Sequence, residues 1–596
     1  MAQPPPAISE ETYFKEYDPR ITRRLFGYTT PYRRQLLIAL LMMIIGSTAA
    51  VAGPYFVKVA IDSGMRDGSL PALRLAVLLY AATAIAQWAA TYLRVNIMAR
   101  AGQSIIYDLR ARLFEHLQLL SLGFYSRFSV GRVITRVIND VGVLREFLTW
   151  TVLAVARDLF TLGGILVAML AMDLRLSLIT FTVLPVMVVI TVVLRRKARQ
   201  NYRLVRVAIS WVNSVLAENI NAVRVVQAFS RQETNYTFYR DEVNRNHLDA
   251  KVRAARVAAA FPAAIDLLGA IATGFVVWLG GAAVLGSGSG AITPGVLVAF
   301  VLYISRFFDP IRDLSRRYDT FQSTMAGGER IFALMDTSVE VQDPADAFDL
   351  PSIRGEVQLE AVSFHYSDDP TTVLQNVNLH VYPGETIALV GRTGAGKTTL
   401  VKLLSRFHDP TAGRVLVDGY DLRRVTQRSL RSQMGIVLQD PFLFSGSIAE
   451  NMRFGRPQAA DAEMRAAAQA VGLADFIDQL PLGYDTPVEE GGVMLSVGQR
   501  QLISFARALL ADPRILILDE ATSSVDTQTE LAIQKALSRL MQARTSFVIA
   551  HRLSTVVNAN RIVVIEDGRI VEQGSHKDLL EKGGVYYHLY QSGLED

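Results

Sequence analysis

The chain has 596 residues, which is more than a single domain ordinarily holds. Hydrophobic residues make up 50% of it, charged residues only 20%, and the mean hydropathy is +0.24, a combination that excludes an ordinary soluble protein and indicates that part of the chain lies in lipid. The net charge of +5 comes from arginines beside apolar segments, which argues against nucleic acid as a partner. The chain has no cysteine, which excludes disulfides and cysteine-ligated metal.

Long apolar segments dominate the first half of the chain. Residues 35–57 carry no charge, and a helix of about 20 apolar residues spans the hydrocarbon core of a bilayer. The other apolar runs are residues 75–93, 147–172, 176–194 and 257–308, the last divided in two by a Gly/Ser-rich segment at 286–290. Buried helices of a soluble protein, the alternative, would give shorter runs of about 10 to 14 residues. We therefore predict a membrane domain of six transmembrane helices.

Basic residues are concentrated on one side of the predicted membrane. Arginines precede the first apolar run, and arginines and a lysine follow the second, fourth and sixth runs, whereas the opposite side carries few basic residues. Cytoplasmic loops carry the excess of Lys and Arg in membrane proteins. The pattern therefore predicts a cytoplasmic N-terminus, and an even number of crossings returns the C-terminus to the cytoplasm.

Two long connections lie on the predicted cytoplasmic side, at residues 94–145 and 195–256. Apolar residues recur at helical spacing within 208–229, which predicts helical arms. We expect the far ends of the arms, residues 123–131 and 218–229, to contact a cytoplasmic domain; the alternative is that they are solvated turns.

Ionisable residues also occur within the predicted spans. Asp266 follows Pro262 in the fifth span, and an acidic group at that depth faces a cavity or a partner, so that a substrate contact and a structural pairing both remain open. Arg157 and Asp158 are adjacent near the start of the third span. Because neighbouring residues do not share a helix face, we expect these two side chains to be apart, at the membrane interface.

A glycine-rich loop opens the second half of the chain. Residues 391–398, GRTGAGKT, fit the pattern G-x-x-x-x-G-K-[ST], with an apolar strand at 387–390 before it and a helix after it, as in an α/β ATPase domain. Backbone N–H groups of such a loop surround nucleotide phosphates and its lysine reaches them, which predicts ATP as a ligand. The predicted nucleotide-binding residues here are Gly391, Arg392, Thr393, Gly394, Ala395, Gly396, Lys397, Thr398 and Thr399.

A second apolar strand, residues 514–518, ends in two acids. Asp519 can hold Mg²⁺ beside the hydroxyl of Thr398, and Glu520 can deprotonate an attacking water. The alternative is an ordinary N-cap pair at a strand-to-helix turn. The acids therefore predict Mg²⁺ as a second cofactor.

Residues 495–501, LSVGQRQ, precede an apolar-periodic helix. Ser496 and Gly498 would present a hydroxyl and backbone N–H groups to an anion at the helix start. This segment resembles the signature of ATP-binding cassette (ABC) proteins, usually written LSGGQ, and with the two preceding motifs the resemblance extends over nearly the whole chain. Apolar spans ahead of one cassette resemble an exporter half-transporter of the multidrug or lipid type. Val497 stands where the commoner signature has glycine, and we expect reduced or retuned activity.

The resemblance implies further roles. Tyr366 would stack on adenine, Gln439 would sense the γ-phosphate, Glu520 would be the catalytic base and His551 the switch histidine, with Lys397 assisting catalysis. The other implied residues are Ser496, Gly498, Gln499 and Asp526 for nucleotide, and Thr398, Gln439 and Asp519 for metal. In this family the signature of one chain completes the ATP site of another, which implies a dimer; homodimer and heterodimer both remain open. Residues 488–492 fall where exporters contact the arms of the partner.

We predict an α-helical membrane domain with long cytoplasmic helical extensions, joined to an α/β P-loop ATPase domain. The predicted divisions are a cytoplasmic segment at 1–34, a six-helix transmembrane domain at 35–336, a linker at 337–354 and a nucleotide-binding domain at 355–596. The predicted function is ATP-driven export by alternating access, and the alternative is an ATP-gated channel or regulatory subunit. We expect a multi-pass protein of the bacterial cytoplasmic membrane, in contact with the lipid bilayer, that carries an unidentified small molecule, lipid or peptide.

Overall fold

The computed structural model describes residues 18–286, 292–366, 369, 371–519, 527–550 and 553–592. Its contacts divide the chain into two compact units. The first unit comprises Met1–Gln118 and Ser129–Thr337, and the second comprises Leu119–Phe128 and Ser338–Asp596. A short piece of the first half of the chain thus belongs to the second unit.

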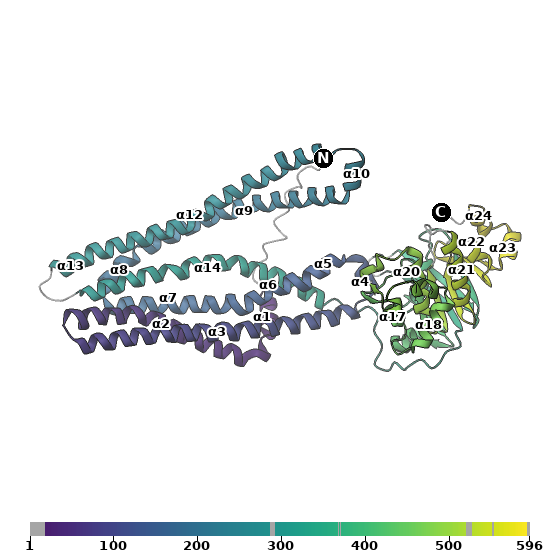
Figure 1. Cartoon of the computed structure of the whole chain (residues 1–596), viewed down its shortest axis with the longest axis horizontal. Coiled ribbons are helices and arrows are strands. Elements are labelled where there is room, and N and C mark those ends of the chain that lie inside the picture. Colours follow the sequence, from purple (N-terminus) through teal and green to yellow (C-terminus); the bar gives the residue numbers. More distant parts are fainter. Residues whose placement is uncertain are drawn as a thin grey trace. The chain divides into compact units, whose positions relative to one another are not determined.

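Long helices build the first unit (Figure 1). Among the described residues, five helical segments are long and apolar enough to cross a membrane: Thr30–Arg66, Leu70–Leu119, Val130–Met172, Leu174–Asn221 and Gln232–Leu285. A further long helix, α14, has 42 residues and is compatible with a sixth span. The α-helices are α1 (Pro19–Gly27), α2 (Arg33–Val59), α3 (Leu70–Leu119), α5 (Val130–Thr135), α6 (Val141–Arg145), α7 (Val152–Met172), α8 (Leu174–Phe181), α9 (Val183–Asn221), α10 (Val223–Ala228), α11 (Gln232–Phe238), α12 (Arg245–Phe275), α13 (Gly281–Gly286) and α14 (Pro294–Met335).

Many large apolar side chains lie on the surface of this unit, as expected of a protein in lipid. Large side chains such as Leu78, Trp88 and Val167 are exposed on the single chain. Such helices would be unstable in water and are typical of a membrane span. Inside the unit, α7, α8, α9, α12 and α14 bury a common core that includes Ile165 and Phe300.

The two long connections are helical, as predicted. Helix α9 has 39 residues, or about 58 Å at 1.5 Å per residue, and it pairs with α12 along its length, with α10 at their far end (Figure 1). Val212 and Val215 of α9 bury against Val243, which explains the helical spacing of apolar residues in the second arm.

Arg157 and Asp158 correct one expectation. Arg157 Nε and Nη2 donate to Asp158 Oδ1 at 2.9 and 2.7 Å, and Asp313 of α14 lies 3.7 Å from the same guanidinium. The Asp158 side chain is only 3% exposed. The prediction that adjacency keeps these groups apart was wrong, because it considered the direction of Cβ and neglected the reach of a long arginine side chain.

The second unit contains two main sheets. The six-stranded sheet has the order β12-β11-β3-β10-β9-β6 and is parallel except for β12. Its strands are β3 (Thr386–Val390), β6 (Met434–Val437), β9 (Ile515–Asp519), β10 (Thr545–Ile549), β11 (Arg561–Glu566) and β12 (Arg569–Gly574). The antiparallel sheet has the order β2-β1-β4-β5, from β1 (Val357–His365), β2 (Thr372–Val381), β4 (Ala412–Val417) and β5 (Tyr420–Asp421), and β7 (Gly446–Ser447) pairs with β8 (Pro487–Val488).

Helices flank these sheets. They are α4 (Leu122–Arg127), α15 (Lys397–Leu404), α16 (Gln427–Arg431), α17 (Ile448–Arg453), α18 (Asp461–Ala470), α19 (Ala474–Asp478), α20 (Val497–Leu510), α21 (Thr527–Met541), α22 (Leu553–Val557), α23 (His576–Lys582) and α24 (Val585–Gln591). Together with the sheets they form the α/β architecture that the sequence predicts for this part of the chain.

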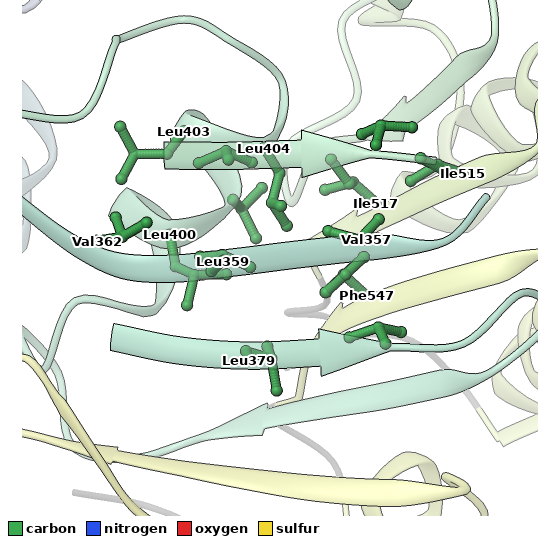
Figure 2. Close-up of a cluster of buried hydrophobic side chains, with 14 of the residues drawn as sticks. Val357, Leu359, Val362, Leu379, Leu400, Leu403, Leu404, Ile515, Ile517 and Phe547 are labelled. Carbon is green, nitrogen blue, oxygen red and sulfur yellow. The ribbon is translucent and has the colours of Figure 1, made fainter. Parts of the chain in front are cut away.

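The six-stranded sheet is buried on both faces. Ile515 and Ile517 of β9 point into a core shared with α15 and the antiparallel sheet, where Figure 2 shows Leu400 and Phe547. Leu516 and Leu518 point the opposite way, into a core shared with α17, α18, α20 and α21. Successive strand residues alternate between faces, so a continuous apolar strand serves two cores at once. The resulting rigid sheet positions the loops at its carboxyl edge.

Candidate functional site

The glycine-rich loop connects β3 to α15. Gly391, Gly394 and Gly396 have φ values of +153°, +86° and +108°, which disfavour any residue with a side chain. A Cβ on Gly391 would lie 2.1 Å from the carbonyl oxygen of Ile565. The loop therefore presents its backbone rather than side chains, which is the arrangement that surrounds phosphate groups.

Lys397 supplies the positive charge of the loop. Its ammonium group donates to the carbonyl oxygens of Gly391 at 2.5 Å and Arg392 at 3.0 Å, and the residue is 9% exposed. Burial lowers the pKa of Lys397, and the nearby carboxylate of Asp519 acts in the opposite direction. A cation held inside the loop suits a nucleotide phosphate.

Four parallel strands end at the same edge of the sheet. Ile549 of β10 lies opposite both Leu389 of β3 and Asp519 of β9, and Val437 of β6 lies opposite Leu518. Ligands bind outside the carboxyl ends of parallel strands. This register brings the strand ends that carry the loop, Asp519 and Gln439 to one edge. Glu520, Asp526 and His551 lie outside the described residues.

The residues at this edge fit a magnesium ion. The side chains of Thr398 and Gln439 are exposed, and Asp519 is partly exposed at the end of β9. Mg²⁺ takes oxygen ligands, usually from one or two protein groups together with phosphates and water. Among the residues that the structure describes, no group of three His, Asp or Glu side chains could hold a metal ion.

Tyr366 follows β1 and is held on several sides. Its ring is perpendicular to those of Phe364 and His408, with centroids 5.0 and 5.4 Å away. Its hydroxyl lies 3.1 Å from Oγ1 of Thr399, and Nζ of Lys402 lies 6.0 Å from the ring centre. The ring is thus tied to the helix that begins at the phosphate loop, as an adenine platform requires.

The signature residues build the start of α20. Ser496 Oγ accepts from the backbone N–H of Gln499 at 3.2 Å, and Gln499 Oε1 accepts from the N–H of Ser496 at 2.9 Å. This reciprocal cap uses groups that the sequence analysis assigned to nucleotide, and the S-x-x-Q spacing is the signal that predicts it. Within the described chain, neither residue hydrogen-bonds to the phosphate loop. Gly498 is buried, and Val497 is 42% exposed without a positive φ, so glycine's freedom is not required at position 497.

Of the two arm ends predicted to contact the cytoplasmic domain, part of the first, Leu119–Phe128, belongs to the second unit, whereas a contact by residues 218–229 stays a prediction. Helix α4 packs within the second unit, where Arg127 Nη2 donates to Glu340 Oε1 at 3.1 Å. A Cβ on Gly123 would lie 3.4 Å from Glu340 Oε2 and 3.7 Å from Cε1 of His408. Glu340 and His408 could not be predicted from the sequence, because only the tertiary fold brings them to α4.

Comparisons with known proteins agree with this architecture. Residues 36–311 match the family model for the ABC transporter transmembrane region, and residues 374–523 match the model for ABC transporter. The chain is 40% identical to the uncharacterised ABC transporter ATP-binding protein YknV of Bacillus subtilis, over 98% of this chain and 96% of the relative. It is 37% identical to the ATP-dependent lipid A-core flippase of Desulfotalea psychrophila, over 96% and 99%.

A solved structure is similar over the same length. It is described as a bacterial Atm1-family ABC exporter with ATP bound, and it matches with a TM-score of 0.75 and 32% identity over 95% of this chain and 99% of that one. The match includes both the helical membrane part and the α/β part. The chain therefore belongs to the ABC transporters, as an exporter half-transporter whose nucleotide-binding domain couples ATP hydrolysis to export through an integral membrane domain.

Proposed function

We propose that two half-transporters, each contributing one phosphate loop and one signature, hydrolyse MgATP at their shared interface and export cargo by alternating access. The observation that carries the proposal is that Ser496 and Gln499 cap a helix packed on α17, α18 and α21, with no hydrogen bond to the phosphate loop of their own chain. The phosphate loop and the signature, which form the two halves of a nucleotide site, lie on separate parts of the domain. A second chain supplies the complement.

The residues at the carboxyl edge of the sheet have different roles in ATP binding and hydrolysis. The backbone of residues 391–398 binds phosphates, Lys397 neutralises them, and Tyr366 stacks on adenine. Thr398, Gln439 and Asp519 would hold Mg²⁺, which neutralises charge on the phosphates when bound. Glu520 deprotonates the attacking water, while His551 and Asp526 position the γ-phosphate end, roles proposed from their places in the sequence.

The cytoplasmic arms carry closure of the nucleotide site into the membrane. Helix α4 holds Glu340 through Arg127, and residues 488–492, where Glu489 and Glu490 are exposed, offer a second surface. We assign that surface to the partner's arm. The proposal includes domain limits of 1–34, 35–336, 337–354 and 355–596, with both termini in the cytoplasm of a bacterium. The excess of Arg and Lys on one side of the spans supports this orientation, and the bacterial relatives support the source.

A cavity in the membrane domain whose lining includes charged side chains is the candidate site for the cargo's polar part. It measures about 450 Å³, and its charged lining residues are Arg94, Arg157, Asp158, Arg306, Asp309 and Asp313. Charged side chains that line a cavity within a membrane domain mark substrate pathways. Among the relatives are a lipid A-core flippase and proteins named as putative multidrug exporters, which supports lipid or small-molecule cargo. Asp266 does not line this cavity, and its role stays a prediction.

The test uses the Glu520→Gln variant in lipid nanodiscs. The variant should bind ATP and hold two chains in a stable complex with hydrolysis reduced by about 100-fold or more, because the water loses its base. Native mass spectrometry and phosphate release measure both properties. Rapid turnover by E520Q would contradict the assignment. In inverted vesicles the wild type should accumulate cargo against a gradient, whereas an ATP-gated channel would only equilibrate it.

A further inference from the structure

His408 lies between the adenine platform and α4. It follows α15, and its side chain is 7% exposed. Its ring is perpendicular to that of Tyr366 at 5.4 Å and tilted against that of Phe364 at 5.4 Å. Edge-to-face aromatic contacts fix ring orientation as well as distance. The imidazole therefore restricts the orientation of the Tyr366 ring from one side, while Thr399 holds the Tyr366 hydroxyl.

The other side of the imidazole faces α4 and its partner. Glu340 Oε2 lies 3.9 Å from His408 Nδ1, and Glu340 Oε1 accepts from Arg127 of α4 at 3.1 Å. The backbone of α4 approaches closely, since a Cβ on Gly123 would lie 3.7 Å from Cε1 of His408. One buried ring thus contacts the end of a cytoplasmic arm and the adenine platform at once.

Burial keeps this ring neutral near neutral pH. Burial lowers the pKa of His408, and Lys402 acts in the same direction, while Glu340 and Asp409 oppose both. A neutral imidazole packs against aromatic rings without a desolvated charge. Its position therefore depends on packing from both sides, with Arg127 holding Glu340 in place.

We propose that His408 is a positioning residue that adjusts the Tyr366 ring, and with it the affinity for adenine, to the docking of α4. The inference rests on the proposed function, because it takes Tyr366 as the adenine platform. A displacement of α4, which follows the membrane helix α3, shifts Glu340 and His408 and reaches the base of the nucleotide without involving the phosphate loop. Affinity for ATP and the rate of hydrolysis are then controlled by separate parts of the site.

The first test compares variants of His408 in the full chain in nanodiscs. His408→Ala should raise the KM for ATP about fivefold, the size of one aromatic contact, while kcat at saturating ATP changes less than about twofold. His408→Phe, which keeps a ring, should restore most of the affinity. In the E520Q background, calorimetry should show ATP binding weakened about fivefold by H408A and binding of inorganic tripolyphosphate unchanged. Equal weakening of both ligands, or a loss confined to kcat, would overturn the proposal.

The second test asks whether α4 affects ATP binding through the Tyr366 ring. Arg127→Gln should weaken ATP binding about threefold in the wild-type background and have no effect in the Tyr366→Ala background, because both act through one ring. Additive effects would overturn the proposal. Arg414→Gln on β4, which removes an exposed pair with Glu360 of β1, is the control and should leave ATP binding unchanged. If Y366A itself leaves ATP binding unchanged, the adenine platform is wrong; if Y366A weakens binding and H408A does not, only this inference fails.

Discussion

The ammonium group of Lys397 lies 2.5 Å from the carbonyl oxygen of Gly391, six residues earlier in the same loop. The lysine and the first glycine of the motif thus stabilise each other, because the glycine allows the turn and the lysine ammonium donates a hydrogen bond to the glycine carbonyl. This contact lies within the loop itself and joins two residues of the motif. Mutation of Lys397 should therefore affect nucleotide binding, and mutation of Gly391 should affect folding.

Replacing Lys397 tests the binding consequence. Lys397→Met keeps the length of the side chain but loses its charge, so we expect ATP to bind about 10- to 100-fold more weakly, the value of one or two charge-assisted hydrogen bonds. Isothermal titration of the protein with ATP measures the change. Unfolding temperature should fall little. Unchanged affinity would show that the ammonium does not reach the phosphates.

Replacing Gly391 tests the folding consequence. Gly391→Ala places a Cβ 2.1 Å from the carbonyl oxygen of Ile565, at a φ of +153°. We expect a loss of about 3 kcal/mol or more in the stability of the ATPase domain, because backbone must move. Gly384 is the matched control, since its φ is +78° but no atom lies within 4 Å, and Gly384→Ala should cost only about 1 kcal/mol. Equal losses would contradict the steric explanation.

Tyr586 predicts a dependence of stability on alkaline pH. Burial raises the pKa of its hydroxyl from 10.0 to about 12. The folded state therefore holds this proton more tightly than the unfolded state, so the contribution is complete below pH 10 and is lost as the pH rises toward 12. The full loss is about 2 to 3 kcal/mol.

Thermal unfolding between pH 9 and 12 measures this loss. Tyr586→Phe should flatten the decline, whereas Tyr587→Phe, at a half-buried neighbour, should not. A decline of the same size in Y586F would mean that other groups cause it.

The pair of Arg157 and Asp158 predicts an asymmetry between single and double variants. Arg157→Gln leaves a carboxylate that is 3% exposed without its guanidinium, which should cost about 3 kcal/mol. The double variant with Asp158→Asn removes the charge as well and should recover much of that loss. Unfolding temperatures in nanodiscs report both. If the double variant is the less stable, the two residues stabilise the helix independently.

Val497 predicts a change in activity without a large change in folding. It is the first residue of α20, exposed and without a positive φ, so Val497→Gly should cost at most about 1 kcal/mol of stability. Glycine lets a second chain approach more closely at this helix start, and we expect kcat for ATP hydrolysis to rise about two- to fivefold. A variant with unchanged kcat would show that the branched side chain does not affect closure.

Local patterns in the sequence predicted the architecture well, and tertiary contacts account for what they missed. The phosphate loop, the strand ending in Asp519 and the apolar spans depend on residues close together in the chain, so spacing alone reveals them. The partners of Tyr366 could not be predicted, since Thr399 is 33 residues away and lies on a different element. The contacts of His408 and Glu340 with α4 also depend on the folded chain. The S-x-x-Q spacing predicts the cap between Ser496 and Gln499 as well as a contact with nucleotide.

The most direct test of the central claim is ATP hydrolysis by nanodiscs sorted by the number of chains they contain. If the nucleotide site requires the phosphate loop of one chain and the signature of another, discs with two copies should hydrolyse ATP and discs with one copy should be inactive although they bind ATP. Hydrolysis by one-copy discs at the same rate per chain would contradict the account.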